Sequence, residues 1–474
     1  MSEMLTRRRL LIHGGLTGLV LAGGRLDVLA HPGGPETAAG QTEDLWATAA
    51  TILGRIKAPV FPARDILVTA HGAKGDGTTD CTAAFRAAIE ACRAAGGGRV
   101  VVPVGRFLTG AIRLRSNVNL HVLEGGTIAF RHEAEAYLPL VLTRFEGVEL
   151  MNYSPFIYAL DETNVGISGR GTLDGQADAE HWWSWRRNQT PSRNKLFQMA
   201  EDGVAPDRRV FGPGDSLLRV NFIQPYRCQN VLIEGVSIVN SPMWELNPVL
   251  CTNVTISGVR INSHGPNNDG ADPESCRDVL IEKCVFDTGD DCIALKSGRN
   301  ADGRRLARPI ENVIIRDCDM KDGHGGVTIG SEISGGARNI FAEKCRMDSP
   351  RLDRALRFKN NAARGGLIER VAMRDVIVGE VAEAVVAADF FYEEGKNGAF
   401  TPVLRDVDVR NVTSRKSKYA LLLRGFDNAP ISNVRIQDCK FDGVETDDRL
   451  EGVKDLVLTN VTVNGKRRDE RINR

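Results

Sequence analysis

The sequence predicts an all-β protein: a right-handed parallel β-helix with a helix that covers its N-terminal end. A short pattern, Asn-Val-x-Ile or a close variant, returns at intervals of about 22 to 34 residues, which is the range of solenoid repeats. Each return joins a polar turn to a strand of alternating apolar residues. The chain contains 49 glycines, and 6% of its residues are aromatic, as suits many short strands with tight turns.

The repeated pattern supplies both the turn and the strand of each coil. Asparagine at the turn tolerates left-handed backbone dihedral angles, and its side chain can bond to the asparagines of the coils above and below. A short parallel sheet cannot bury its apolar face alone, so successive coils must stack. A leucine-rich repeat or a propeller is the alternative, but leucine has no fixed spacing and no Trp-Asp signature occurs. The pattern begins at Asn230, Asn253, Asp278, Asn312, Asn339, Asn433 and Asp455.

Residues 1–30 resemble a twin-arginine export signal. Three arginines, Arg7 to Arg9, precede an apolar run that reaches about Gly24. This run is too short to span a membrane, so we expect a protein that is exported to the periplasm or secreted. The alternative is a basic tail, which seldom leads into such an apolar run.

Two helices are expected before the coils. Within an N-terminal linker, residues 31–62, the segment 45–56 is amphipathic. The segment 82–95 has apolar residues at helical spacing, with Asp80 or Thr82 as its N-cap and three glycines at its end. We expect this second helix to cover the open end of the stack and the first helix to pack near it.

The coils are expected to form one domain, residues 63–464, followed by a frayed polar tail, residues 465–474. Ten cysteines would permit a disulfide framework in an exported protein. Four of them, however, occupy the same place in the repeat, so we expect buried thiols that act as small apolar residues. The four are Cys284, Cys318, Cys345 and Cys439.

Composition excludes several classes of partner. Lys plus Arg and Asp plus Glu number 61 each, so no overall field draws the chain to nucleic acid or to an anionic membrane. An anionic substrate must therefore be held by a local group of cations. No CxxC pair indicates zinc.

Three aspartates are the candidate acid and base groups. Hydrolysis of a glycosidic bond needs one carboxyl group that protonates the leaving oxygen and another that activates water or attacks directly. The interval from Asp269 to Asp290 is close to one coil, so we expect these two aspartates on neighbouring coils. Crowding raises the pKa of at least one carboxyl group. Because Asp290 and Asp291 are adjacent, a bend or bulge at Gly289 must turn both to one side.

One imidazole and two cations follow at regular intervals. His324 follows Asp291 by one larger coil, and Arg357 follows His324 by the same interval. We expect His324 to bond an aspartate and hold its protonation state, the alternative being a structural histidine. Arg357 and Lys359 share one face of a strand and can grip a substrate carboxylate, the alternative being a solvated pair.

These segments resemble the motifs of glycoside hydrolase family 28, the polygalacturonases. The similarity extends from about Arg64 to Gly443. Two departures, Asn268 for threonine and Phe358 for isoleucine, fall between the functional positions. The family's Asn-Thr-Asp, Gly-Asp-Asp, Gly-His-Gly and Arg-Ile-Lys read here Asn267-Asn268-Asp269, Gly289-Asp290-Asp291, Gly323-His324-Gly325 and Arg357-Phe358-Lys359.

The resemblance implies an inverting glycosidase, without metal or cofactor, that cleaves the α-1,4-galacturonosidic bonds of pectin or polygalacturonate. It makes Asp290 the general acid, Asp269 and Asp291 the pair that activates water, and His324 a supporting residue. Inversion predicts about 6.5 to 9.5 Å between the acid and base carboxyl groups. The residues that would bind galacturonate are Arg357, Lys359 and Asn267.

The expected partner is a pectic polysaccharide or an oligogalacturonide, bound by a monomer. Insertions around Trp182 and Tyr392 favour exo-action because they could wall off one end of the binding site. The tryptophans of the first insertion either stack on sugar rings or pack the loop. Rhamnogalacturonan or a substituted pectin is an alternative substrate. Two alternative functions are a pectate lyase, which would use calcium and a basic proton acceptor, and a non-catalytic β-helical carbohydrate-binding protein.

Overall fold

The structure, a computed structural model, describes residues 45–474 except 215. The expected export signal lies outside the described residues. Residues Asp44–Arg474 form one compact unit. Among the described residues, no helix is long and apolar enough to cross a membrane.

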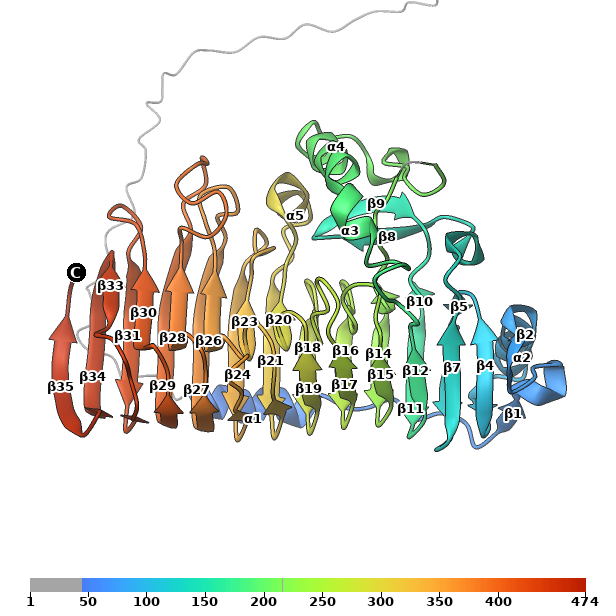
Figure 1. Cartoon of the computed structure of the whole chain (residues 1–474), viewed down its shortest axis with the longest axis horizontal. Coiled ribbons are helices and arrows are strands. Elements are labelled where there is room, and N and C mark those ends of the chain that lie inside the picture. Colours follow the sequence, from blue (N-terminus) through green and yellow to red (C-terminus); the bar gives the residue numbers. More distant parts are fainter. Residues whose placement is uncertain (1–44, 215) are drawn as a thin grey trace, which may run out of the picture. The chain divides into compact units, whose positions relative to one another are not determined.

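Parallel strands stack in three ladders, and the chain visits the ladders in the same order again and again (Figure 1). We call one such passage a coil. Residues Leu246 and Ala271 continue the third ladder as single bridges between β13 and β20. The prediction of a mostly β protein with stacked parallel strands is confirmed, whereas the handedness of the winding stays a prediction.

The first ladder carries the strand of the repeated pattern. Its members are β1 (Asp65–Leu67), β3 (Gly98–Val102), β6 (Val118–Val122), β11 (Thr163–Gly169), β14 (Gln229–Glu234), β16 (Thr252–Ser257), β18 (Arg277–Glu282), β21 (Ile310–Arg316), β24 (Ala337–Glu343), β27 (Leu367–Glu380), β29 (Val403–Lys416), β31 (Ile431–Gln437) and β34 (Val453–Val463).

The second ladder follows directly, and the long strands β27, β29 and β34 belong to both. Its other members are β2 (Asp76–Asp80), β4 (Gly105–Thr109), β7 (Gly126–Phe130), β12 (Thr172–Asp174), β15 (Ser237–Val239), β17 (Arg260–Ser263), β19 (Val285–Thr288), β22 (Asp319–Met320), β25 (Arg346–Met347) and β32 (Lys440–Phe441).

The third ladder completes each coil. It contains β5 (Ile112–Arg113), β10 (Ile157–Leu160), β13 (Ile223–Tyr226), β20 (Ile293–Leu295), β23 (Val327–Ile329), β26 (Arg354–Lys359), β28 (Ala384–Asp389), β30 (Tyr419–Arg424) and β33 (Arg449–Glu451).

Asparagine side chains bond from coil to coil, as predicted, at the second residue of first-ladder strands, where each coil enters the ladder. Asn164, Asn230 and Asn253 have φ of 55°, 57° and 58°. Asn253 Nδ2 donates to Asn230 Oδ1 (2.7 Å), and Asn230 Nδ2 donates to Asn164 Oδ1 (2.8 Å). Each of these asparagines therefore supplies a left-handed residue to its coil and hydrogen-bonds the side-chain amide of the neighbouring coil.

Apolar side chains from all three ladders fill the space between them and form the main core. All ten cysteines are free and buried, which confirms the prediction that they act as small apolar residues.

Helix α2 (Thr82–Ala94) buries Phe85, Ala88 and Ile89 against the first members of the ladders, as predicted. The Asp80 carboxylate accepts from the backbone N–H of Thr82 at its start (2.9 Å). This helix covers the N-terminal end of the core.

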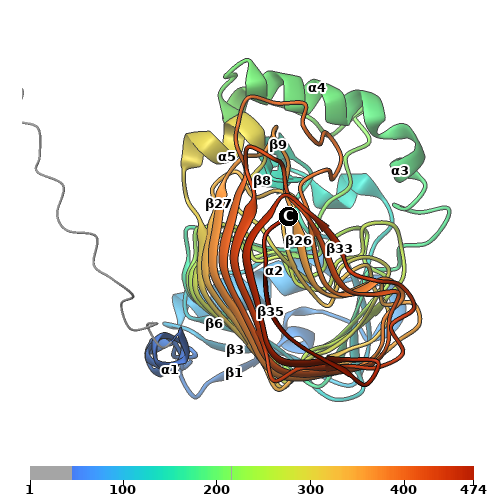
Figure 2. The same cartoon turned by 90° about the vertical axis from the view of Figure 1, so that its left-hand side faces the viewer.

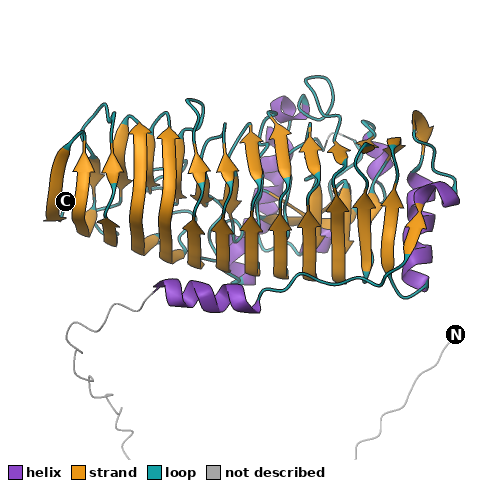
Figure 3. Cartoon of the chain, turned by 90° about the horizontal axis from the view of Figure 1, so that it is seen from below, coloured by secondary structure: helices purple, strands orange, loops and turns teal. Residues whose placement is uncertain are grey.

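Helix α1 (Leu45–Arg55) forms where the amphipathic segment was predicted, but not beside α2. Its buried residues Trp46 and Ile52 pack on Leu280, Ile314 and Phe341. Figure 3 shows this helix lying along the middle strands rather than at an end of the stack. The spacing of its apolar residues fixes which face is buried and carries no information on the partner.

Insertions gather at one side of the coils (Figure 2). Trp182 is buried against Tyr137 and Phe156, so this tryptophan packs the loop rather than a sugar. The elements are the hairpin β8 (Val141–Phe145) and β9 (Val148–Asn152), the helices α3 (Trp185–Asn188), α4 (Thr190–Glu201) and α5 (Asn300–Leu306), and the 3₁₀ turns Ala134–Tyr137 and Pro206–Arg208; a third 3₁₀ turn, Val68–His71, lies near α2.

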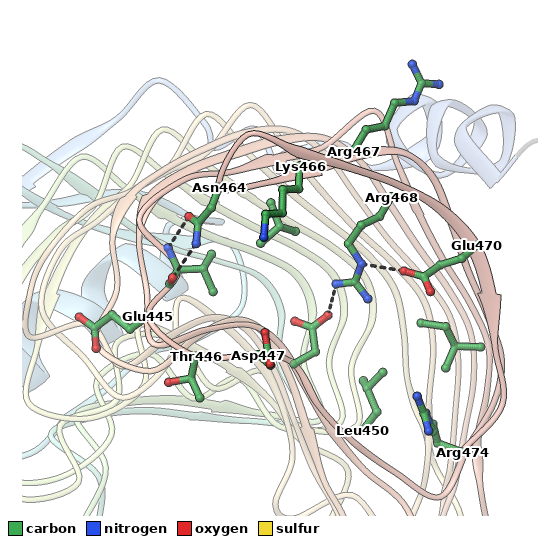
Figure 4. A pocket seen from close by; sticks show the side chains of 14 residues that line it. Glu445, Thr446, Asp447, Leu450, Asn464, Lys466, Arg467, Arg468, Glu470 and Arg474 are labelled. Carbon is green, nitrogen blue, oxygen red and sulfur yellow. Dashed lines mark hydrogen bonds and ion pairs between the residues drawn. The ribbon is translucent and has the colours of Figure 1, made fainter.

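The C-terminal segment corrects a prediction. Instead of a frayed tail, residues Lys466–Ile472 form β35, which pairs antiparallel with β34. A pocket beside it is lined mainly by charged side chains, and Arg468 Nε donates to Glu470 (2.7 Å) within it (Figure 4). Ion pairs among these residues order a segment whose polar composition suggested fraying.

Candidate active site

The predicted site residues lie on neighbouring coils, at the entry to the third ladder. Asp269 precedes the bridge residue Ala271, and Asp290 and Asp291 lie in the turn from β19 to β20. His324 lies in the next turn, from β22 to β23. On the following coil, Arg357 and Lys359 belong to strand β26.

The three carboxyl groups converge. One oxygen of each of Asp269, Asp290 and Asp291 lies within 4.8 Å of the others. Gly289 permits this turn, because a Cβ there would stand 2.6 Å from the carbonyl oxygen of Gly265. The need for an unusual backbone at Gly289 was predicted from the adjacency of the two aspartates.

The carboxyl groups lie closer together than the inverting mechanism predicted. The expected separation of about 6.5 to 9.5 Å belongs to two carboxyl groups that face each other across a sugar. Here Asp290 and Asp291 are neighbours in sequence, and parallel strands stand about 4.8 Å apart, which sets the distance to Asp269. The separation in the free protein therefore does not decide the stereochemistry.

Asp291 is buried and holds both predicted substrate-binding cations. Lys359 Nζ lies 2.6 Å from its Oδ2, and Arg357 NH1 lies 3.2 Å from its Oδ1. The Thr328 hydroxyl donates to the same Oδ1 (3.0 Å). Burial opposes ionisation, but the charges of Lys359 and Arg357 outweigh it and hold the pKa of Asp291 well below its usual range. Asp291 is thus held in its ionised form.

Asp269 lies in the opposite electrostatic environment. Its burial raises its pKa, and the carboxylates of Asp272 and Asp290 raise it further. Its Oδ1 is buried without a hydrogen-bond partner. Two of the three carboxyl groups therefore differ in their tendency to hold a proton.

His324 lies beside Asp290 and more than half of its side chain is exposed. Its Nδ1 is 2.9 Å from Asp290 Oδ1. The hydrogen bond to Asp290 raises the pKa of His324, and the charge of that carboxylate acts in the same direction. The imidazole is therefore protonated to a higher pH than a free histidine.

The two asparagines of the first motif, Asn267 and Asn268, make different contacts. Asn267 accepts a hydrogen bond from the buried guanidinium of Arg219 (2.7 Å) through its side-chain oxygen. Asn268 is buried, and its Oδ1 accepts from the Ser263 hydroxyl and from the Gly265 N–H (both 2.7 Å). Asn268 thereby fixes the turn that carries Asp269.

Three groups near the aspartates were not predicted. Lys296 and Asp272 follow the aspartate motifs by a few residues, and the buried Glu245 precedes Leu246 on the coil before Asp269. Their positions near the motifs could have indicated a place in the site. Lys and Glu are seldom buried, however, so the residue types favoured exposed side chains there. The ring of Tyr392 lies 5.4 Å from Lys359 Nζ and 5.8 Å from the guanidinium of Arg357.

Two groups among the described residues have carboxylates close enough to hold a cation. The first is the aspartate cluster, which already faces the ammonium of Lys359. In the second, His264 Nε2 lies 3.0 Å from Asp287 and the third member, Asp322, pairs with Arg351 (2.5 Å). Protein cations thus balance carboxylates in both groups.

Comparison with known proteins identifies the family. The profile of "Glycosyl hydrolases family 28" matches residues 218–463. The crystal structure of a hyperthermoactive exopolygalacturonase from Thermotoga maritima is 45% identical, with a TM-score of 0.87, over 90% of this chain and 99% of that one. An exo-poly-alpha-D-galacturonosidase of Dickeya chrysanthemi is 27% identical, over 85% of this chain and 74% of its own length. A probable polygalacturonase of Vitis vinifera is 26% identical, over 77% of this chain and 72% of its own length. The chain belongs to glycoside hydrolase family 28, as a polygalacturonase-like glycosidase.

Proposed function

We propose that this enzyme removes galacturonate units from the end of polygalacturonate chains by hydrolysis of α-1,4 bonds with inversion. The observation that carries the proposal is the convergence of three carboxyl groups beside an arginine and a lysine. The carboxyl groups supply acid and base catalysis, and the cations suit a uronic acid at the scissile bond.

In the proposed mechanism, Asp290 protonates the leaving oxygen. The ionised Asp291 takes the proton from the attacking water, and its neighbour Asp269 is the second member of the pair that activates this water. His324 bonds Asp290 and supports its change of charge. The residues that bind galacturonate are Arg357, Lys359 and Asn267.

Substrate binding would also change the base. Arg357 and Lys359 hold Asp291 in the free protein. A galacturonate carboxylate that binds these cations competes with Asp291 for them. Weaker contacts to the cations make Asp291 a stronger base at the moment when water must be activated.

Exo-action is supported by the similarity to the Thermotoga maritima exopolygalacturonase and by the insertions. The segment around Tyr392 contacts a buried arginine, Arg299, whose NH2 lies 3.3 Å from Glu393 and 3.4 Å from Glu394. The guanidinium of Arg299 also lies over the ring of Phe197 in α4, 4.4 Å from its centroid. Two insertions are thus tied together next to the site.

The remaining features of the proposal are a right-handed parallel β-helix, export through the twin-arginine signal of residues 1–30, and a monomeric state. Conversion of a precursor to a shorter form on export, with its new N-terminus determined by sequencing, would test the second of these.

Product analysis tests the function. Purified protein is incubated with polygalacturonate, and product lengths are followed over time. Monomer or dimer from the outset is expected, whereas a ladder of sizes would mean endo-action. Asp290→Asn should lower the rate by about 10³-fold while the protein stays folded at the assay temperature. An unsaturated product absorbing in the ultraviolet would indicate a lyase instead.

Proton NMR of the first products tests the stereochemistry. Inversion of an α-linkage should give the β-anomer first, before mutarotation. Appearance of the α-anomer first would show retention and would make one aspartate a nucleophile.

A further inference from the structure

Lys296 is a buried ammonium group in contact with one of the catalytic carboxyl groups. Its side chain is 3% exposed. Its Nζ lies 3.2 Å from Glu332, 3.3 Å from Asp272 and 3.7 Å from Asp269. The same Nζ stands over the ring of Trp244, 4.3 Å from its centroid. A lysine so buried does not reach the substrate, so its effect must pass through these neighbours.

Glu332 anchors the ammonium on one side. Its Oε2 accepts a hydrogen bond from Lys296, and its Oε1 accepts from Arg299 NH1 (3.3 Å). Burial opposes ionisation of Glu332, but the charges of Lys296 and Arg299 lower its pKa. Burial likewise opposes the charge of Lys296, yet Glu332 and Asp272 raise its pKa. Both groups of this anchor therefore stay charged.

On the other side, the ammonium faces negative charge around Asp269. The carboxyl groups close to Asp269 are those of Glu245, Asp272, Asp290 and Asp291. Burial raises the pKa of Glu245 and that of Asp272, and the positive charge of Lys296 opposes the rise at Asp272. Of the nearby cations, Arg219 donates to backbone oxygens and to Asn267, and Lys359 is engaged by Asp291.

We propose that Lys296 is a positioning residue that fixes the Asp269 carboxyl group and keeps it available as a base against the surrounding carboxylates. This inference rests on the proposed function. The geometry places one ammonium within 4 Å of the carboxylates of Asp269, Asp272 and Glu332 and over the ring of Trp244. Loss of the ammonium would leave Asp269 among like charges and protonated over a wider pH range.

Two substitutions should act in opposite directions. The acid limb is the part of the profile of kcat against pH where kcat falls on the acid side. Lys296→Gln removes the cation, so this limb, measured on polygalacturonate, should move to higher pH by about 1 pH unit. The maximal kcat should fall at least tenfold, with KM within about twofold of the wild-type value. Asp272→Asn removes a carboxylate, so the acid limb should move to lower pH. Lys296→Arg keeps the charge and should restore the wild-type limb.

A buried ion pair away from the aspartates provides the control. Arg209 pairs with Asp302 (2.8 Å), and both side chains are buried. Arg209→Gln should lower the unfolding temperature without moving the acid limb. An acid limb that stays in place or moves down in Lys296→Gln overturns the inference. If that variant does not fold, an unmoved limb in Asp272→Asn does so.

A second measurement separates this inference from the proposed function. Should the wild type release no sugar, the proposed function fails, and potentiometric titration of the folded proteins then decides the role of Lys296. On titration from acid, Lys296→Gln should have released up to about one proton fewer than the wild type near neutral pH, because its carboxyl groups titrate later and the lysine of the wild type releases its own proton only at higher pH. Identical titration curves overturn the inference.

Discussion

The contact between Lys359 and Asp291 serves stability before substrate arrives. Asp291 is fully buried, and Lys359 lies 2.6 Å from it. Buried charges are tolerable only when they are balanced, and the loss of Lys359 would leave Asp291 balanced in part only, by Arg357. The same side chain thus supports the free protein and, in the proposed mechanism, the substrate complex.

Lys359→Met should therefore lower the free energy of unfolding by about 3 to 5 kcal/mol. Denaturant unfolding at neutral pH measures this change. The double variant Lys359→Met with Asp291→Asn should recover part of the loss, because the unpaired charge is gone. A single variant as stable as the wild type would contradict the prediction.

The His324–Asp290 pair makes stability depend on pH in a defined direction. Its hydrogen bond raises the pKa of His324 in the folded protein. A raised pKa stabilises the fold fully below the unfolded pKa of about 6.5, and the effect is lost as pH rises through the folded value.

His324→Gln should consequently lower the unfolding temperature more at about pH 5.5 than at about pH 9, two values that bracket the titration. Thermal unfolding of both proteins across this range gives the comparison. An equal difference at both ends would mean that the imidazolium charge contributes nothing.

The charged site residues could be predicted from the sequence because residues that are one coil apart in a stacked chain lie close together in space. The intervals between the motifs correspond to single coils, so Asp269, Asp290, His324 and Arg357 had to meet. Lys296 was missed because a lysine near a motif is normally exposed. Its burial depends on Glu332, from the next coil, and no periodicity signals such a pairing.

Among the elements, the position where each coil enters the first ladder carries the clearest sequence signal of the fold. Asn230 combines a left-handed backbone with hydrogen bonds to Asn164 and Asn253. The left-handed backbone costs about 1 kcal/mol for most residues other than glycine and asparagine. Asparagine avoids most of this cost, and its side chain adds hydrogen bonds between coils.

Substitution at Asn230 can separate these two contributions. Asn230→Gly removes the hydrogen bonds but keeps the backbone unstrained, and should cost about 1 kcal/mol. Asn230→Ala should cost about 1 kcal/mol more, because alanine disfavours the left-handed region. Chemical denaturation of the two variants measures the difference; equal stabilities would mean that the backbone conformation is unstrained for alanine.

A helix or strand could be predicted where its own residues determine its structure. It could be predicted less well where its structure or position depends on a partner distant in sequence. The apolar spacing of α2 gave both its extent and its buried face. For α1 it gave the helix but not its place on β18, β21 and β24. For β35, charged composition concealed a strand whose order depends on pairing with β34.

At the scale of the molecule, stability comes from stacking and does not require cross-links. All ten cysteines are free and buried among apolar side chains. A reducing agent should leave the unfolding temperature unchanged within about 1 °C, since no disulfide constrains the unfolded chain. Differential scanning calorimetry with and without dithiothreitol makes the test. A drop of several degrees on reduction would reveal a cross-link.

The last strand has a consequence for how copies of the protein behave in concentrated solution. The last strand in a stack of parallel coils presents unpaired backbone N–H and C=O groups. Such groups could pair with the first coil of another copy of the chain, and repeated pairing would give a filament. Here β35 runs against the direction of the stack and carries charges of both signs, from Lys466 to Arg471. An incoming first coil would meet reversed polarity and solvated side chains, so the reversal acts as a terminator of growth.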